Sequence, residues 1–220
     1  MDNSNINNTW PVAKEGLPFI LIGSIVTLGL VFLTPWYIPA TAGILTLFII
    51  FFFRDPERLQ DPMNDRAVLT PADGTILEVL HFHGTDNPLG QAAVRISIFM
   101  SIFNVHVNRI PVGGIIEKIS YYPGKFFSAN LDKASKENER NMITLKSERD
   151  CRIVVVQIAG LIARRIACWI EKGDPVIRGQ RFGLIRFGSR LEVYLPVNSE
   201  ITVKVRQKVR AGKSLIGYLP

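Results

Sequence analysis

The sequence predicts a mainly β protein, with an antiparallel β-sandwich or barrel-like domain that follows an N-terminal hydrophobic helical hairpin. Two long apolar runs near the N-terminus predict the hairpin. Short segments rich in β-branched residues, separated by glycine and proline, predict the sheet domain. The 220 residues are 47% hydrophobic and 20% charged, which excludes an intrinsically disordered chain. We therefore expect a hairpin over residues 1–53 and a β domain over residues 54–220.

The apolar runs extend from Leu17 to Leu33 and from Ile38 to Phe53, and no charged residue lies between Glu15 and Arg54. As a helix, each run reaches about 25 Å, close to the ~30 Å hydrocarbon core of a bilayer. A cleaved signal peptide is the alternative, but mostly polar residues precede the first run and a second run follows at once. The runs therefore predict a hairpin that anchors the chain in a membrane.

The residues that flank the two runs predict the orientation of the hairpin. Trp36 and Tyr37 lie in the break between the runs, where aromatic side chains suit a membrane interface. Arg54 and Arg58 follow the second run, and positive residues favour the cytoplasmic side. We expect both ends of the hairpin at the cytoplasmic face of the cell membrane.

The charge of the remaining chain favours a lipid surface as its partner. Residues 54–220 hold 25 of the 26 basic and 17 of the 19 acidic residues, a net charge of +8. A basic domain tethered to a membrane is attracted to anionic lipid headgroups. The sequence contains no zinc-finger, helix-turn-helix or RNP-like pattern, so we expect no nucleic acid partner.

Five runs after the hairpin have the composition of strands, and several alternate apolar with polar residues. They are Gly74–Leu80, Ala93–Phe99, Arg152–Gln157, Leu191–Leu195 and Ile201–Val205. The charged segment Phe126–Asn141 lacks β-branched residues and is predicted to be helical or a loop. The chain has no GxGxxG or Walker pattern that would indicate nucleotide binding.

The usual metal-binding and redox patterns are not present in the sequence. Cys151 and Cys168 fit no CxxC or Cys/His spacing, which favours two inert thiols. His81 and His83 lie two residues apart on one predicted strand, without obvious further ligands. We therefore expect no metal site.

Three residues are candidates for chemistry, although each is a weak signal on its own. His106 lies in the alternating stretch Phe103–Pro111, where a structural histidine is the more common explanation. Asp73 lies between Ala72 and Gly74 and suits a turn. Ser189 follows Gly188, but the chain contains a second Gly-Ser pair at Gly23 and Ser24.

The surroundings of these residues are far more specific. The stretches PADG, FMSIFNVHVNRIPVGG, NERN, GLIARRIACW and GQRFGLIRFGSRLEVYLP begin at residues 71, 99, 138, 160 and 179. In this order they strongly resemble the phosphatidylserine decarboxylase proenzymes. The resemblance covers nearly everything from Phe52 onward and is closest to the short class, which begins with a hydrophobic region and a motif like FFRDPER, here at residues 52–58.

The resemblance implies a proenzyme that cleaves itself between Gly188 and Ser189 into chains 1–188 and 189–220. Ser189 then becomes a pyruvoyl cofactor, and the enzyme converts phosphatidylserine in the membrane to phosphatidylethanolamine and carbon dioxide. Matched by motif, Asp73 and His106 are the other catalytic residues. Many longer members carry a second histidine where this chain has Phe103. The sequence leaves the oligomeric state open, and a homo-oligomer remains one of the alternatives.

The chemistry explains why those residue types are needed. Ser189 needs a base to attack the Gly188 carbonyl, and His106 can act as that base with Asp73 orienting its imidazole. The phosphodiester headgroup calls for basic residues, and Arg109, Arg164, Arg165 and Arg190 lie in the motifs without a clear ranking.

Two other classes of function remain open from the residues. A membrane-anchored serine hydrolase would use Ser189, His106 and Asp73 without self-cleavage, so its chain would stay intact. A membrane-anchored binding module would need none of the three residues. An intact or a cleaved chain on a denaturing gel distinguishes the hydrolase from the decarboxylase.

Overall fold

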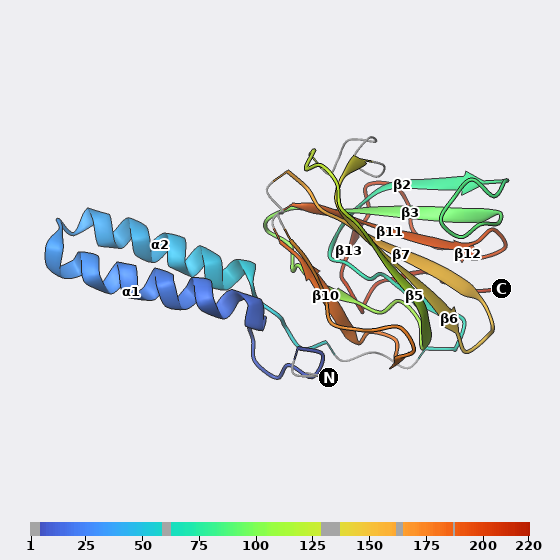
Figure 1. Cartoon of the computed structure of the whole chain (residues 1–220), viewed down its shortest axis with the longest axis horizontal. Helices are drawn as coiled ribbons and strands as arrows, with labels where there is room; N and C mark the ends of the chain where they lie inside the picture. The colour runs from blue at the N-terminus through green and yellow to red at the C-terminus, as the bar shows by residue number, and fades with distance from the viewer. Residues whose placement is uncertain (1–4, 59–62, 129–136, 162–164, 187) are drawn as a thin grey trace. The chain divides into compact units, whose positions relative to one another are not determined.

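The computed structural model describes residues 5–58, 63–128, 137–161, 165–186 and 188–220. The chain forms two compact units, Met1–Glu57 and Arg58–Pro220. The first unit is helical and the second consists of antiparallel sheets (Figure 1). The predicted fold class, mainly β with an N-terminal helical pair, is confirmed.

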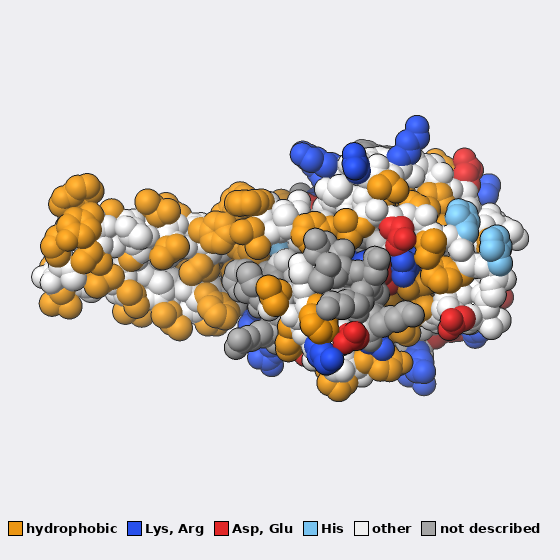
Figure 2. All heavy atoms as spheres, turned by 90° about the horizontal axis from the view of Figure 1, so that it is seen from above, with side chains coloured by type: hydrophobic (Ala, Val, Ile, Leu, Met, Phe, Trp, Pro, Cys, Tyr) orange, Lys and Arg blue, Asp and Glu red, His pale blue; other side chains and the backbone are white. Residues whose placement is uncertain are grey.

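The helical unit contains a short 3-10 helix, Lys14–Gly16, and two α-helices, α1 (Leu17–Leu33) and α2 (Tyr37–Phe52). The helices contact each other where Thr27 Oγ1 lies 3.3 Å from Thr46 Oγ1. A Cβ on Gly23 would lie 2.8 Å from Thr46 Oγ1, so the glycine permits this close approach. No residue of α1 is buried, and the helices present an almost entirely hydrophobic surface (Figure 2).

Among the described residues, one helical segment, Lys14–Leu33, which joins the 3-10 helix to α1, is long and apolar enough to cross a membrane. The second helix, Tyr37–Phe52, is apolar but shorter. Its end is marked by Arg54, whose guanidinium lies 3.9 Å above the Phe51 ring. The helix bounds agree closely with the apolar runs because uninterrupted apolar residues leave no internal breaking signal.

The second unit is built from three antiparallel sheets. The large sheet has the order β13-β2-β3-β11-β7-β6-β5-β9 and curls into a half barrel (Figure 1). The smaller sheets have the orders β4-β10-β8 and β1-β14-β12. The strands are β1 Ala67–Leu69, β2 Gly74–Phe82, β3 Ala93–Met100, β4 Val107–Arg109, β5 Gly114–Tyr122, β6 Arg140–Ser147, β7 Arg152–Ile158, β8 Ile166–Cys168, β9 Pro175–Val176, β10 Arg181–Ile185, β11 Ser189–Pro196, β12 Glu200–Ile201, β13 Lys208–Val209 and β14 Leu215–Tyr218.

Strand β11 is central in the large sheet, paired with β3 on one side and β7 on the other. Its side chains alternate between two faces. Leu191, Val193 and Leu195 are fully buried on one face, while Tyr194 on the other packs with Val154 and Val156 of β7. Because both faces are covered, every residue from Ser189 to Leu195 is buried.

Two sequence-based expectations need correction. Of the expected strand Ile201–Val205, only Ile201 lies in a strand, β12, because the partner β14 is short and the chain turns at Arg206, which has a positive φ of 69°. In the segment Phe126–Asn141, Arg140 already begins strand β6. Residues 129–136 of that segment lie outside the described residues.

Candidate active site

Gly188 and Ser189 lie where β10 leads into β11. Gly188 has a φ of 57°, a left-handed conformation that glycine adopts without steric cost. Among the described residues, no atom lies within 4 Å of the position that a Cβ would take on Gly188. The backbone conformation, rather than crowding, therefore requires a glycine before Ser189.

Ser189 begins β11 and is fully buried, opposite Met100 at the end of β3. By strand alternation its side chain lies on the same face as Leu191 and Val193. The Ser189 hydroxyl donates to the Met100 Sδ atom at 3.3 Å. The predicted nucleophile thus lies in the interior of the domain, where a thioether accepts its hydrogen bond.

His106 is 1% exposed and directly precedes β4. Strand β4 pairs with β10, and Val107 lies opposite Leu184. This register brings His106 to the end of β10 that leads into Gly188. Phe103, which stands where longer relatives have a second histidine, is 64% exposed.

Asp73 directly precedes β2 and is 8% exposed. The segment before it runs beside β4, because the Leu69 amide donates to the Pro111 carbonyl and the Arg109 amide donates to the Pro71 carbonyl. On its other side, Thr75 of β2 pairs with Phe99 of β3, so Asp73 lies near the end of β3, where Met100 pairs with Ser189. The fold therefore brings Asp73, His106 and Ser189 to one region, although they are far apart in sequence.

The Asp73 carboxylate is held by Arg58, a residue that the sequence did not assign to the site. The Arg58 guanidinium donates to both Asp73 oxygens, at 2.6 and 2.9 Å, and the Ala211 amide donates to Oδ1 at 2.7 Å. An Asp73–His106 hydrogen bond is not among these contacts, so the orienting role of Asp73 stays a prediction. In the sequence, Arg58 belongs to the FFRDPER stretch and predicts the cytoplasmic end of the hairpin, and neither feature indicates a contact with Asp73.

The arginines considered for headgroup binding occupy different environments. Arg190 is 2% exposed, and its guanidinium donates to Ser97 Oγ and lies 2.9 Å from Glu192. Arg109 is buried and donates to the Gly179 carbonyl. Arg165 is exposed, and Arg164 lies outside the described residues. Arg190 and Arg109 are thus held by contacts within the domain.

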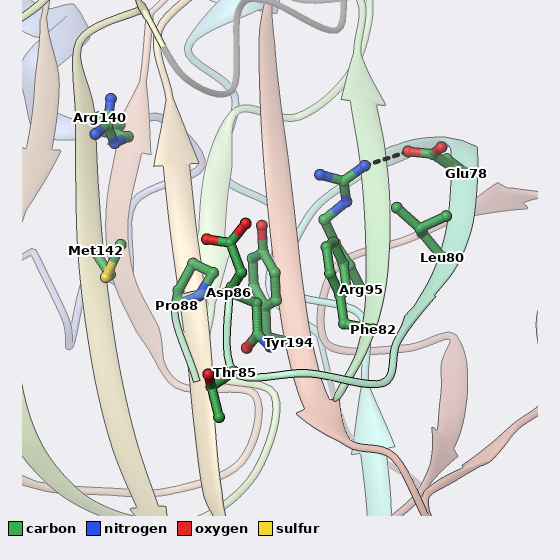
Figure 3. Close-up of a pocket in the computed structure, with 11 residues that line it drawn as sticks. Glu78, Leu80, Phe82, Thr85, Asp86, Pro88, Arg95, Arg140, Met142 and Tyr194 are labelled. Atoms are coloured by element: carbon green, nitrogen blue, oxygen red, sulfur yellow. Dashed lines mark hydrogen bonds and ion pairs between the residues drawn. The ribbon is translucent and has the colours of Figure 1, made fainter. Parts of the chain in front are cut away.

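The other face of β11 borders a cavity of about 660 Å³ that is separate from Ser189. Tyr194, Arg95 and Phe82 point into it, with Arg95 paired to Glu78 (Figure 3). Burial, together with the nearby Glu192 carboxylate, raises the pKa of Tyr194. Ser189, His106 and Asp73 do not line this cavity.

The remaining candidate residues lie away from the cleavage pair or are chemically quiet. Burial raises the pKa of the Cys168 thiol, which keeps it protonated at neutral pH. His81 and His83 are exposed at the end of β2. Within the described part of the chain, no three His, Cys, Asp or Glu residues cluster as a metal site would require.

Comparisons with known proteins agree with the motif resemblance. The family described as phosphatidylserine decarboxylase matches residues 45–217. A protein of Syntrophus aciditrophicus named phosphatidylserine decarboxylase proenzyme is 49% identical over 94% of this chain and 96% of its own length. Proteins with the same name from Geotalea uraniireducens and Paraburkholderia phymatum are 45% and 46% identical, covering 97% and 94% of this chain and 99% and 97% of their own lengths.

Proposed function

This chain belongs to the phosphatidylserine decarboxylase family and is a decarboxylase of that type, and we propose that Ser189, His106 and Asp73 carry out the self-cleavage that activates it. The relatives' names, all phosphatidylserine decarboxylase proenzyme, do not support the serine hydrolase alternative. The observation that carries the proposal is the position of Ser189, buried at the start of β11 directly after a left-handed Gly188.

In the first step, the Ser189 Oγ atom bonds to the Gly188 carbonyl carbon while His106 takes the hydroxyl proton. The bond from the Gly188 carbon to the Ser189 nitrogen then breaks, and His106 returns the proton to that nitrogen. The product is an ester between Gly188 and the Ser189 side chain. The left-handed conformation of Gly188 and the open space beside it allow the carbonyl carbon to become tetrahedral.

In the second step, a base removes the proton on the Ser189 α-carbon, and the Gly188 carboxylate leaves from the β-carbon. Chain 1–188 is released from its bond to chain 189–220 with a free carboxylate. Addition of one water and loss of one ammonia convert the new end of the small chain to a pyruvoyl group. Because Ser189 is buried, the water for this step must enter the interior of the domain.

The residues fit a pyruvoyl group, because Ser189 occupies a strand terminus that the sheet holds in place on both sides. When formed, that group supplies an electron sink for decarboxylation of an amino acid headgroup. His106, close to the same end of β11, is suited to return a proton to the substrate carbon after carbon dioxide leaves. We assign this second role to His106 because it is the buried imidazole at that end.

The helical unit is suited to hold this site at a membrane, where phosphatidylserine is located. Phe32, Leu33 and Trp36 are each at least 80% exposed, and no charge lies between Glu15 and Arg54. Burying such side chains in lipid removes apolar surface from water. Arg54 remains the basic residue at the end of α2, consistent with a cytoplasmic orientation, whereas Arg58 is paired with Asp73.

The intact mass of the purified protein tests the proposal. We expect two chains with the masses of residues 1–188 and 189–220, the small one blocked at its N-terminus. The Ser189→Ala variant should stay a single inactive chain. The matched control is Ser24→Ala, at the other Gly-Ser pair, which should mature normally. A single full-length chain in active enzyme, or normal maturation of Ser189→Ala, would overturn the proposal.

A further inference from the structure

Three buried side-chain amides form a line that ends beside Ser189. The Asn141 Nδ2 atom donates to Gln157 Oε1 at 3.0 Å, and the Gln157 Nε2 atom donates to Asn108 Oδ1 at 2.9 Å. The Asn108 Nδ2 atom in turn faces Met100 Sδ at 3.8 Å. All three amides are at most 2% exposed. We call Asn141, Gln157 and Asn108 the amide line.

The amide line crosses from one sheet to the other inside the domain. Asn141 and Gln157 are paired residues of β6 and β7 in the large sheet, and Asn108 belongs to β4 in the facing sheet. Gln157 also pairs with Leu191, so its side chain lies on the face that carries Ser189. A Cβ on Gly183 of β10 would lie 3.0 Å from Gln157 Nε2, so this glycine leaves room for the crossing.

The direction of donation along the line is the same at each step. Because Gln157 donates its hydrogen bond to the Asn108 oxygen, the NH₂ group at the other side of the Asn108 amide faces Met100. Amide bonds that donate in one direction polarise each other and strengthen the last donor. The line therefore presents a fixed, polarised N–H donor at its Asn108 end.

Met100 connects this donor to the reacting serine. The Ser189 hydroxyl also donates to Met100 Sδ, at 3.3 Å, so the Asn108 amide and the Ser189 hydroxyl share one thioether. A thioether is a weak acceptor. The Asn108 donor is thus held close to Ser189 without a strong acceptor of its own among these contacts.

We propose that Asn108 donates a hydrogen bond to the Gly188 carbonyl oxygen as it becomes negative during attack by Ser189. The proposal rests on the self-cleavage proposed above. Asn108 transfers no atom, and its protons stay on Nδ2 while the serine proton goes to His106. Donors fixed before reaction stabilise such an oxyanion without reorganisation. Gln157 and Asn141 are positioning residues that hold the Asn108 donor in place.

The rate of self-cleavage tests the role of Asn108. Full-length chain is synthesised without cells in the presence of detergent, and the small chain is followed over time on denaturing gels. Asn108→Leu keeps the branched shape of the side chain but removes the donor, and we expect cleavage to slow by about 10²- to 10³-fold. The control is Ser97→Ala, which removes a buried hydrogen bond to Arg190. Ser97 lies on the face of β3 opposite to Met100, so this variant should leave the cleavage rate unchanged.

A pH profile of Gln157→Glu separates positioning of the donor from a structural role, and decides the matter if Asn108→Leu does not fold. The ionised carboxylate of this variant can only accept, so the Asn108 NH₂ group would turn toward it and away from Ser189. Protonation at lower pH restores a donor to Asn108, and burial raises the pKa of such a carboxyl. We therefore expect the ratio of variant to wild-type rates to rise as the pH falls.

The outcomes distinguish this proposal from the proposed function. Slow cleavage of Asn108→Leu with a pH-dependent ratio for Gln157→Glu supports the donor role. Cleavage of both variants at the wild-type rate, while Ser189→Ala stays intact, overturns the role of Asn108 alone. Maturation of Ser189→Ala overturns the proposed function itself.

Discussion

The ion pair between Arg58 and Asp73 connects the FFRDPER stretch to the candidate active site. Their side chains are 9% and 11% exposed, and the pair is bidentate. Arginine suits this geometry because its planar fork matches a carboxylate. The pair fixes the position of the Asp73 carboxylate just before β2, and the Ala211 amide donates a further hydrogen bond to it.

Removing one partner of this pair should therefore destabilise the protein. We expect Arg58→Leu to lower the free energy of unfolding by about 3–5 kcal/mol, since it leaves a buried carboxylate without its cation. Self-cleavage should slow as well if Asp73 orients His106. Thermal unfolding of the detergent-solubilised Ser189→Ala chain, which avoids changes caused by cleavage, measures the first effect.

Arg152→Leu is the matched control for Arg58→Leu. Arg152 forms an ion pair with Glu117 on the surface, where it is 64% exposed. Exposed pairs contribute little to stability. An equal loss for the two variants would show that the Arg58–Asp73 pair has no special importance.

Strand β11 explains how a chain can be cut without coming apart. The proposed cut precedes its first residue, and the strand pairs with β3 over its full length and with β7 over most of it. Behind the cut, Arg190 and Glu192 form a buried ion pair, and Tyr194 donates to Glu192. Hydrogen bonds and apolar burial along the strand thus do not depend on the bond between Gly188 and Ser189.

The small chain should therefore stay bound to the large chain after cleavage. We expect both chains to elute together in gel filtration in detergent and to separate only in denaturant. Glu192→Leu, which leaves Arg190 buried without its carboxylate, should lower the denaturant concentration at which they separate. Loss of the small chain from the wild-type protein in native buffer would contradict this account of β11.

At the scale of the whole molecule, the two compact units suggest a division of labour. The proposed catalytic residues and Arg58 all belong to Arg58–Pro220, and the exposed apolar helices belong to Met1–Glu57. The proposed anchor and the proposed chemistry can therefore be separated by deletion. The position of the deletion matters because Arg58 is the first residue of the second unit.

Deletion of residues 1–53 should weaken membrane attachment while self-cleavage continues. Activity should fall further with phosphatidylserine in vesicles than with detergent-dispersed lipid, since only vesicles require the site to be held at a surface. The remaining binding to anionic vesicles should weaken with salt, because residues 54–220 carry a net charge of +8. Vesicle sedimentation and gel analysis measure the two effects.

Deletion of residues 1–58 provides the matched comparison. It removes the same helices but also Arg58, so it should share the instability of Arg58→Leu. If the protein without residues 1–53 failed to mature, or acted on vesicles as well as the full chain, the helices would not be the proposed anchor.

The sequence predicted most where local composition is decisive. The runs that became β2, β3 and β7 are dense in β-branched residues, and the run that became β11 alternates apolar with polar residues. Strand β5, Gly114–Tyr122, was not predicted, because its glutamate, lysine and tyrosines interrupt the alternation of apolar and polar residues. The prediction of a strand over Ile201–Val205 was wrong for most of that run, because composition does not reveal whether a partner strand is long enough.

By itself the sequence determined the family, the Gly188–Ser189 pair and the two apolar helices, because each depends on residues that are contiguous in the chain. Only the tertiary structure decided that Arg58 holds Asp73 and that Asn108, Gln157 and Asn141 form a line to Met100. These contacts join distant segments across two sheets, and their geometry depends on strand register. Register follows from packing of the whole domain, which no local pattern encodes.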